Sequence, residues 1–211
     1  CTSPASHTGL SLGTHLFSVR ATDPAGNTDP TPATHTWTIT APPADCGAPV
    51  TVLASADSWL DENSATANKG SDAILNVRSK GPRDNFRALV RFALPPLPPG
   101  CAIESATLRL HASSSTRGRS LEAIRVTGTW TENGVHWANQ PTTTGLVATT
   151  PSAGGYREWT VATQVQSMYD SGINQGFLIR DAVEGADAEQ QFHGREKGDS
   201  PPQLVLRFAR R

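Results

Sequence analysis

Short segments in which apolar and polar residues alternate run through most of the chain from residue 50 onward. The segment 85–94 shows the pattern most clearly: positions 86, 88, 90 and 92 are apolar, and Arg87 and Arg91 lie between them. Because successive side chains of a strand point to opposite faces, this alternation predicts a strand with one buried face. The same pattern predicts further strands at residues 50–60, 74–78, 105–112, 121–128, 155–161, 176–182, 189–195 and 203–208.

A single helix is predicted, over residues 161–172. Thr160 can cap its start and Gly172 can end it. Three apolar residues share one face of this segment: Val161, Val165 and Met168. Many short strands, polar turns and one short helix predict an all-β fold, a two-sheet antiparallel sandwich. A jelly roll is the first choice for its topology, and an immunoglobulin-like sandwich is the second.

The first forty residues show a separate pattern. Two alternating segments, 16–21 and 34–40, flank a run rich in Asp, Pro, Gly and Asn. Two strands alone cannot bury a hydrophobic core. We therefore expect residues 1–41 to be the C-terminal part of an immunoglobulin-like domain, residues 42–48 to be a Pro-rich linker and residues 49–211 to be the jelly-roll sandwich.

The composition fits a secreted β protein. Charged residues make up 18% of the chain, and its 18 Gly and 16 Pro residues indicate many turns. The net charge of −1 gives no indication of nucleic-acid binding. No apolar run reaches the roughly 18 residues of a membrane span. We expect an extracellular module that neither binds nucleic acid nor inserts into a membrane.

Three cysteines are present, at positions 1, 46 and 101. An odd number with long spacings fits one internal disulfide and one cysteine whose partner lies elsewhere. A bond between Cys46 and Cys101 would tie the residues before the first strand of the main domain to a neighbouring strand. Closing a loop of that length stabilises a fold by about 3–4 kcal/mol on a chain-entropy basis. The alternative, a reduced pair, is unfavourable outside the cell.

The segment 9–40 carries a strand and a turn that match a known pattern. The matching residues are Gly13, His15, Phe17, Val19, Arg20, Ala21, Asp23, Ala25, Gly26 and Asn27. They resemble the last two strands of bacterial immunoglobulin-like repeats. Such repeats are spacers of secreted or cell-surface proteins and often carry a cystine near the position of Cys1. The resemblance therefore implies an extracellular protein and a partner for Cys1 upstream of residue 1.

A second series of motifs spans residues 50–208. It comprises Ala56, Asp57, Trp59 and Leu60; Asn68 and Gly70; residues 75–77; Arg91, Phe92, Leu94 and Pro95; residues 105–110; Trp130, Thr131, Glu132, Val135, Trp137, Asn139 and Pro141; and Arg195, Glu196, Pro202 and Leu204. These motifs resemble the DNRLRE domain of secreted bacterial proteins, which is grouped with jelly-roll carbohydrate-binding modules. Gly194 stands where that family often has Ser. The resemblance implies an extracellular, non-catalytic jelly-roll module attached to enzymes or adhesins, and some relatives bind acidic polysaccharides.

Two tryptophans, Trp130 and Trp137, lie close in sequence to Asn139 and Gln140. One interpretation is a platform on which a sugar ring stacks while the two amides bond its hydroxyls. The other is core packing, in which each indole buries on the order of 200 Å² and its N–H bonds a backbone carbonyl. Core packing is favoured, because the resemblance includes both tryptophans whether or not a relative binds a ligand.

The loop 61–72 and the strand before it are rich in side-chain oxygens, the ligands that calcium prefers. The candidate calcium ligands are Asp57, Asp61, Asn63, Asn68 and Asp72. Jelly-roll carbohydrate modules often hold a structural calcium ion beside their first strand, so the resemblance supports this prediction. The alternative is a solvated loop with Asx turns.

Arginines recur on successive predicted strands, at Arg78, Arg87, Arg91, Arg109 and Arg125. Aligned on one sheet face, they could bind a carboxylated polysaccharide through bidentate pairs. The first four are our candidate ligand-binding residues, together with Trp59. We expect Trp59 to be the exposed tryptophan, because it begins a strand next to a polar loop. The alternative for the arginines is pairing with acidic residues of neighbouring strands.

No motif in the sequence fixes a catalytic site. Glycoside hydrolysis requires two opposed carboxylates, and Asp57 with Glu196 can be named, but nothing sets their geometry. We expect a non-catalytic extracellular module of a larger secreted or surface protein, with a polysaccharide or cell-surface glycan and neighbouring modules of the same protein as its partners. The alternative is a structural spacer or adhesive module without glycan binding.

Overall fold

The computed structural model describes residues 4, 6–41 and 45–211. The chain divides into two compact units, Cys1–Pro43 and Ala44–Arg211. Cys1 and residues 42–44 of the predicted linker lie outside the described residues. The partner of Cys1 therefore stays a prediction.

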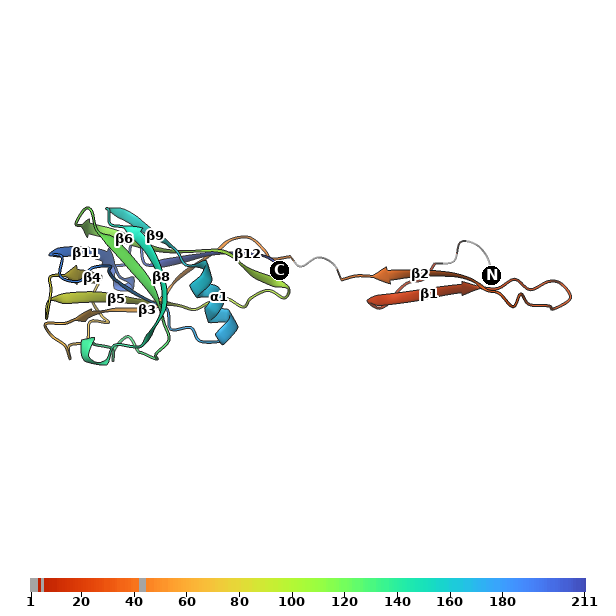
Figure 1. Ribbon diagram of the computed structural model, residues 1–211, viewed down its shortest axis with the longest axis horizontal. Coiled ribbons are helices and arrows are strands. Elements are labelled where there is room, and N and C mark those ends of the chain that lie inside the picture. Colours follow the sequence, from red (N-terminus) through yellow and green to blue (C-terminus); the bar gives the residue numbers. More distant parts are fainter. Residues whose placement is uncertain (1–3, 5, 42–44) are drawn as a thin grey trace. The chain divides into compact units, whose positions relative to one another are not determined.

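The N-terminal unit is an antiparallel ribbon of two strands, β1 (Gly13–Val19) and β2 (Ala33–Ile39) (Figure 1). Trp37 stacks on His15 across the ribbon, with 5.6 Å between the ring centroids. Large apolar side chains nevertheless remain in solvent, and Leu16 is 66% exposed. The exposure agrees with the argument that two strands cannot enclose a core. The immunoglobulin-like origin of this ribbon stays a prediction.

The C-terminal unit is built almost entirely of strands, as the alternating pattern predicts. The strands are β3 (Val50–Asp61), β4 (Ile74–Ser79), β5 (Asn85–Phe92), β6 (Cys101–Ser115), β7 (Ser120–Val126), β8 (Thr143–Pro151), β9 (Gly155–Thr160), β10 (Phe177–Asp181), β11 (Ala188–His193) and β12 (Gln203–Arg210). The helical elements are α1 (Ala162–Ser171) and the 3₁₀ turns η1 (Trp137–Asn139) and η2 (Arg195–Lys197). Among the described residues, no helix is long and apolar enough to cross a membrane.

The strands form two antiparallel sheets packed as a sandwich with barrel-like closure. β3 pairs with β12 through its first half and with β5 through its second, and the register shifts between Ala54 and Ala56. The path of hydrogen-bonded neighbours runs β3–β12–β6–β11–β4–β5 and returns to β3. From β5 one sheet continues through β10, β7 and β8, while β9 adds to β6 in the other. This is the predicted jelly-roll type of sandwich (Figure 1).

The main hydrophobic core fills the space between the sheets. Its largest fully enclosed side chains include Trp159, Phe92, Phe177, Phe192 and Leu108. Positions 86, 88, 90 and 92 of β5 all point into it, as their spacing predicts. The disulfide between Cys46 and Cys101 is present, as the sequence predicts, and Cys101 belongs to this core.

A second, smaller apolar cluster lies on the opposite face of β5 and β10. It contains Leu89 of β5 and Leu178 of β10, and it is covered by Trp130 and Val135. Both covering residues belong to the segment between β7 and β8. That segment therefore folds back over the outer face of one sheet.

The predicted helix is confirmed, with one correction at its start. Gly172 adopts φ +67° and ends the helix, as expected. The predicted cap by Thr160 is wrong. Thr160 is the last residue of β9, and the capping position is taken by Val161, which offers no side-chain acceptor.

Strand β8 was not predicted. It pairs with β7 only, at the edge of its sheet, and most of its residues are exposed. A strand with little buried surface needs no regular alternation of apolar residues, so its sequence carries little of the signal that marks the other strands.

Candidate functional site

The candidate arginines are distributed over three strands, β4, β5 and β6. Arg87 and Arg91 share the outer face of β5 with Leu89, where Arg87 stacks on Trp137 and Arg91 stacks on Trp130, at 4.6 and 4.9 Å from the ring centroids. Arg78 lies on β4, which pairs with β5, and Arg109 lies on β6, which β11 separates from β4. A binding role stays a prediction for each of the four.

Acidic side chains form ion pairs with several of these arginines, as the alternative interpretation expects. Arg78 pairs with Asp84 and Glu189 at 3.0 Å each. Arg87 pairs with Glu184 at 2.7 Å. The fifth arginine, Arg125, is buried and donates hydrogen bonds to serine hydroxyls of α1.

The tryptophan motif serves packing at Trp130. This residue is 6% exposed, and its Nε1 donates to the carbonyl of Gln175 at 2.8 Å. Asn139 donates to the carbonyl of Gly134, and Gln140 accepts from Arg87, so both amides are bound within the protein. The core interpretation is confirmed for Trp130. A shallow hollow of about 280 Å³ remains beside it, lined by Thr129, Trp130, Thr131, Gly134, Val135 and Asn139.

The expectation that Trp59 is the exposed tryptophan is wrong. Trp59 is 7% exposed and belongs to the core between the sheets. Its ring lies 4.9 Å from that of Phe86, and its Nε1 donates to Asp72 at 2.9 Å. The polar loop that indicated exposure folds back onto the strand, and its residue Asp72 accepts the hydrogen bond of the indole N–H.

The candidate calcium ligands are engaged separately in the structure. Asp61 accepts the backbone N–H groups of Asn63 and Ser64, an Asx turn. Asn63 donates to Asp84, and Asp72 accepts from Trp59. Asn68 donates to the carbonyls of Glu132 and Val135. Calcium bound by the loop therefore stays a prediction, and Asp57 is the one candidate that lies among other carboxylates.

The outer face of β9, β6 and β12 carries a compact polar and aromatic group. In the strand register, Arg109 of β6 lies opposite Glu158 of β9 on one side and Gln203 of β12 on the other. Its guanidinium lies 4.4 Å from the ring centroid of Tyr156 and donates to Glu158 at 2.8 Å and to Gln203 at 3.1 Å. A hollow of about 240 Å³ adjoins it, lined by Thr107, Arg109, Glu158 and Val205.

Strand alternation explains why this group faces outward. Leu108 and Leu110 of β6 are fully buried, which turns Arg109 and His111 to the other face, as the sequence predicts. Tyr156 was not singled out as a site residue. It lies opposite His111 in the register and contacts its ring at 5.1 Å. The signal that could have found it is strand alternation: Tyr156 shares a face with Glu158, and the buried Trp159 lies on the other face.

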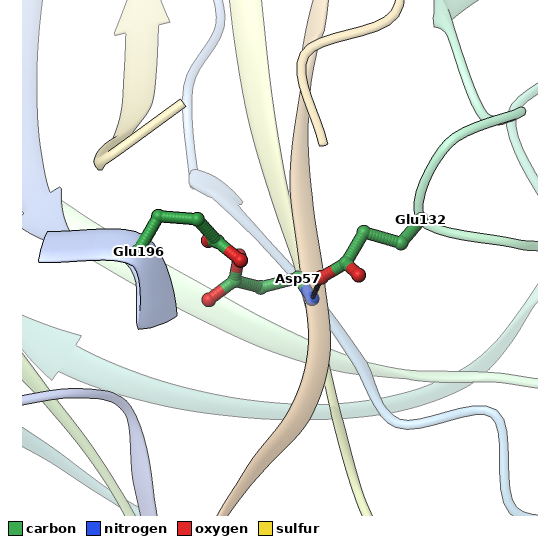
Figure 2. A group of neighbouring side chains, drawn as sticks. All are labelled: Asp57, Glu132 and Glu196. Atoms are coloured by element: carbon green, nitrogen blue, oxygen red, sulfur yellow. Dashed lines mark hydrogen bonds between the residues drawn. The ribbon is translucent and has the colours of Figure 1, made fainter. Parts of the chain in front are cut away.

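A different kind of site lies at Asp57, Glu132 and Glu196, whose carboxylate oxygens come within 4.8 Å of one another (Figure 2). They belong to β3, to the segment between β7 and β8, and to η2. Figure 2 shows the carboxylates of Asp57 and Glu196 facing each other, with Glu132 approaching from the other side of β3. The fold thus brings together three acids that are far apart in sequence.

Backbone and arginine donors contact all three of these acids. Glu132 accepts the backbone N–H of Asp57 at 2.9 Å, and the backbone N–H of Arg195 donates to Asp57 Oδ2 at 2.8 Å. The Arg195 Nη2 lies 2.8 and 2.9 Å from the two Glu132 oxygens and 3.0 Å from Glu196. Asn68 fixes this region from the loop side through the carbonyl of Glu132.

Asp57 is the unusual member of the group. It is 1% exposed, and its Oδ1 has no hydrogen-bond partner among the described residues. Burial, together with the nearby charges of Glu196 and Glu132, raises the pKa of Asp57 to about 7. A carboxyl with this pKa is partly protonated at neutral pH when no cation is bound.

The raised pKa predicts a pH-dependent stability for the protein kept in a metal chelator. The pKa rises from 3.8 to about 7 on folding, so the folded state holds this proton more tightly than the unfolded chain. The free energy of unfolding should therefore fall as the pH rises from about 4 to 7, by on the order of 2–4 kcal/mol, and level off above 7. Urea unfolding at several pH values measures this.

Asp57→Asn is the matched variant for that experiment, because Asn cannot ionise. The difference in unfolding free energy between the two proteins should favour the unaltered chain increasingly as the pH falls from 7 to 4. A difference that stays constant over this range would show that Asp57 titrates alike in the folded and unfolded states.

The C-terminal unit is thus a jelly-roll β-sandwich that carries a polar and aromatic group on one sheet face. Residues 48–208 match the model of carbohydrate-binding module family 96, and the chain belongs to this family. The match covers the sandwich and most of the C-terminal unit. None of the curated proteins compared with the chain matches it.

Proposed function

We propose that the C-terminal unit is a non-catalytic module that binds a polysaccharide on the outer face of β9, β6 and β12. Membership of a carbohydrate-binding module family supports a carbohydrate as the ligand. The observation that carries the location is the stacking of Arg109 on Tyr156 between Glu158 and Gln203. The other sheet has its corresponding face covered by the segment that contains Trp130.

The chemistry of this face suits a sugar chain. A stacked guanidinium and phenol give a flat surface on which the C–H face of a sugar ring packs. The amide of Gln203 and the carboxylate of Glu158 bond hydroxyls, and a guanidinium pairs with the carboxylate of a uronic acid.

The geometry of the acids supports the absence of catalysis. In glycosidases the two carboxyl groups flank the scissile bond at separations of about 5 Å or more, with room for substrate between them. Asp57 and Glu196, the pair that the sequence allows, face each other directly and share Arg195 with Glu132 (Figure 2). Asp57 is also buried, so a glycosidic bond cannot lie between them.

An extracellular location completes the proposal. The disulfide between Cys46 and Cys101 persists in oxidising compartments. The N-terminal ribbon, with its exposed apolar residues, supports a place within a longer secreted or surface protein whose neighbouring modules cover it.

Arg109→Ala and Tyr156→Ala test the proposed face. A glycan array of neutral and uronic-acid polysaccharides first identifies a ligand, and calorimetry with an oligosaccharide of that ligand measures its affinity. Each substitution should weaken binding at least tenfold, because each removes half of the stacked pair.

The matched control is Arg180→Ala. Arg180 of β10 pairs with Glu122 across strands at 2.7 Å, as Arg109 pairs with Glu158 at 2.8 Å, but it lies in the other sheet. This variant should bind as the unaltered protein does. Equal losses in all three variants would contradict the proposed location. An array without any bound glycan would favour the spacer or adhesive function.

A further inference from the structure

We propose that Asp57, Glu132 and Glu196 form a divalent-cation site, with calcium as the ion that suits it, and that the ion joins three segments of the sandwich. The proposal is independent of glycan binding. It also places calcium elsewhere than the loop 61–72, and of the ligands suggested by the sequence it retains Asp57.

The distances between the three carboxylates fit one shared ion. Calcium binds oxygen ligands at 2.3–2.6 Å, so two oxygens on the same ion are at most about 5 Å apart. One oxygen from each of the three residues satisfies this, because all three lie within 4.8 Å of one another. Calcium takes six to eight ligands, and bidentate carboxylates, carbonyls or water supply the rest.

Asp57 Oδ1 gives the second, independent indication. The Asp57 side chain is almost wholly enclosed, yet this oxygen has no hydrogen-bond partner among the described residues. Buried polar atoms in native proteins nearly always have a partner. Figure 2 shows the Asp57 carboxylate directed at that of Glu196, which offers only acceptors when ionised. A positive species between the two carboxylates resolves this contact.

The local charge is also that of a cation site. The three carboxylates carry −3 when ionised, and Arg195 contributes +1 through its contacts with Glu132 and Glu196, which leaves −2. A divalent ion neutralises this remainder. Ionised side chains are rarely buried unless they are paired or bind a metal.

The position of the site explains what the ion would do. Asp57 lies in β3, Glu132 lies in the segment that covers the second apolar cluster, and Glu196 lies in η2, just after β11. One ion bound to all three would fix the covering segment and the η2 turn to the first strand of the sandwich. Its role is therefore structural.

Titration of calcium chloride into chelator-treated protein at pH 7.5 tests the proposal, by calorimetry and by thermal unfolding. We expect one ion per chain and a rise in Tm of roughly 5 °C or more when calcium is at one hundred times Kd. Asp57→Asn and Glu196→Gln should each weaken calcium binding at least tenfold and abolish most of the shift in Tm.

Two control variants make the result specific. Asp61→Asn keeps the Oδ1 acceptor of the Asx turn and tests the loop 61–72, and Asp187→Asn removes an acid whose side chain is 85% exposed. Both should bind calcium as the unaltered protein does. The proposal is overturned if calcium produces neither heat nor a shift in Tm, or if the effect survives in Glu196→Gln and is lost in Asp61→Asn.

Discussion

Trp159→Ala is expected to destabilise the C-terminal unit by about 4 kcal/mol. Trp159 is fully buried on β9, and its Nε1 donates to the carbonyl of Leu121 on β7 at 3.0 Å, so the bond crosses from one sheet to the other. Its ring also meets the edge of Phe192. The substitution leaves a cavity that the surrounding strands cannot fill and a buried carbonyl without its donor. Urea unfolding monitored by circular dichroism measures the loss.

Two companion variants separate the causes. Trp159→Phe keeps most of the apolar volume and loses the N–H donor, so it should cost less than Trp159→Ala. Thr160→Ala changes the next residue, which is exposed, and should alter stability by less than about 0.5 kcal/mol. A loss below about 1 kcal/mol for Trp159→Ala would mean that the layer between the sheets is not the source of stability.

Removal of the disulfide is expected to have the second large effect. Cys46 and Cys101 are 55 residues apart, and the bond limits the conformations of the unfolded chain over that length. The double variant Cys46→Ser, Cys101→Ser should lose about 3–4 kcal/mol, which lowers Tm by roughly 10 °C for a unit of this size.

Reduction of the unaltered protein provides the comparison for that variant. Treatment with dithiothreitol should bring its unfolding midpoint close to that of the double serine variant, since both then lack the same constraint. If the oxidised, reduced and double-variant proteins unfold at the same denaturant concentration, the bond does not contribute to stability.

Much of the sandwich could be predicted because burial imposes a period of two on the sequence. Strands with one face in the core, such as β5 and β6, show the alternation plainly. The edge strand β8 escaped prediction because most of its residues face solvent. The predicted cap of α1 was wrong for a local reason. Thr160 is the last residue of β9, and Val161 follows it at the capping position.

The sites were less predictable because they depend on which strands become neighbours. Alternation correctly turned Arg109 outward, but its contact with Tyr156 requires β9 to pair with β6, which no local pattern reveals. Asp57 and Glu132 both belong to motifs of the family resemblance, yet they are 75 residues apart and their meeting is a property of the fold. The burial of Trp59 was equally hidden, because the hydrogen bond from its indole to Asp72 depends on how the loop folds back onto the strand.

An amide chemical-shift map of the isotope-labelled chain with a bound oligosaccharide tests the central claim most directly. The account predicts that the largest perturbations fall on β9, β6 and β12 around Tyr156, Arg109 and Gln203. Perturbations centred on the hollow beside Trp130, or on the N-terminal ribbon, would contradict it.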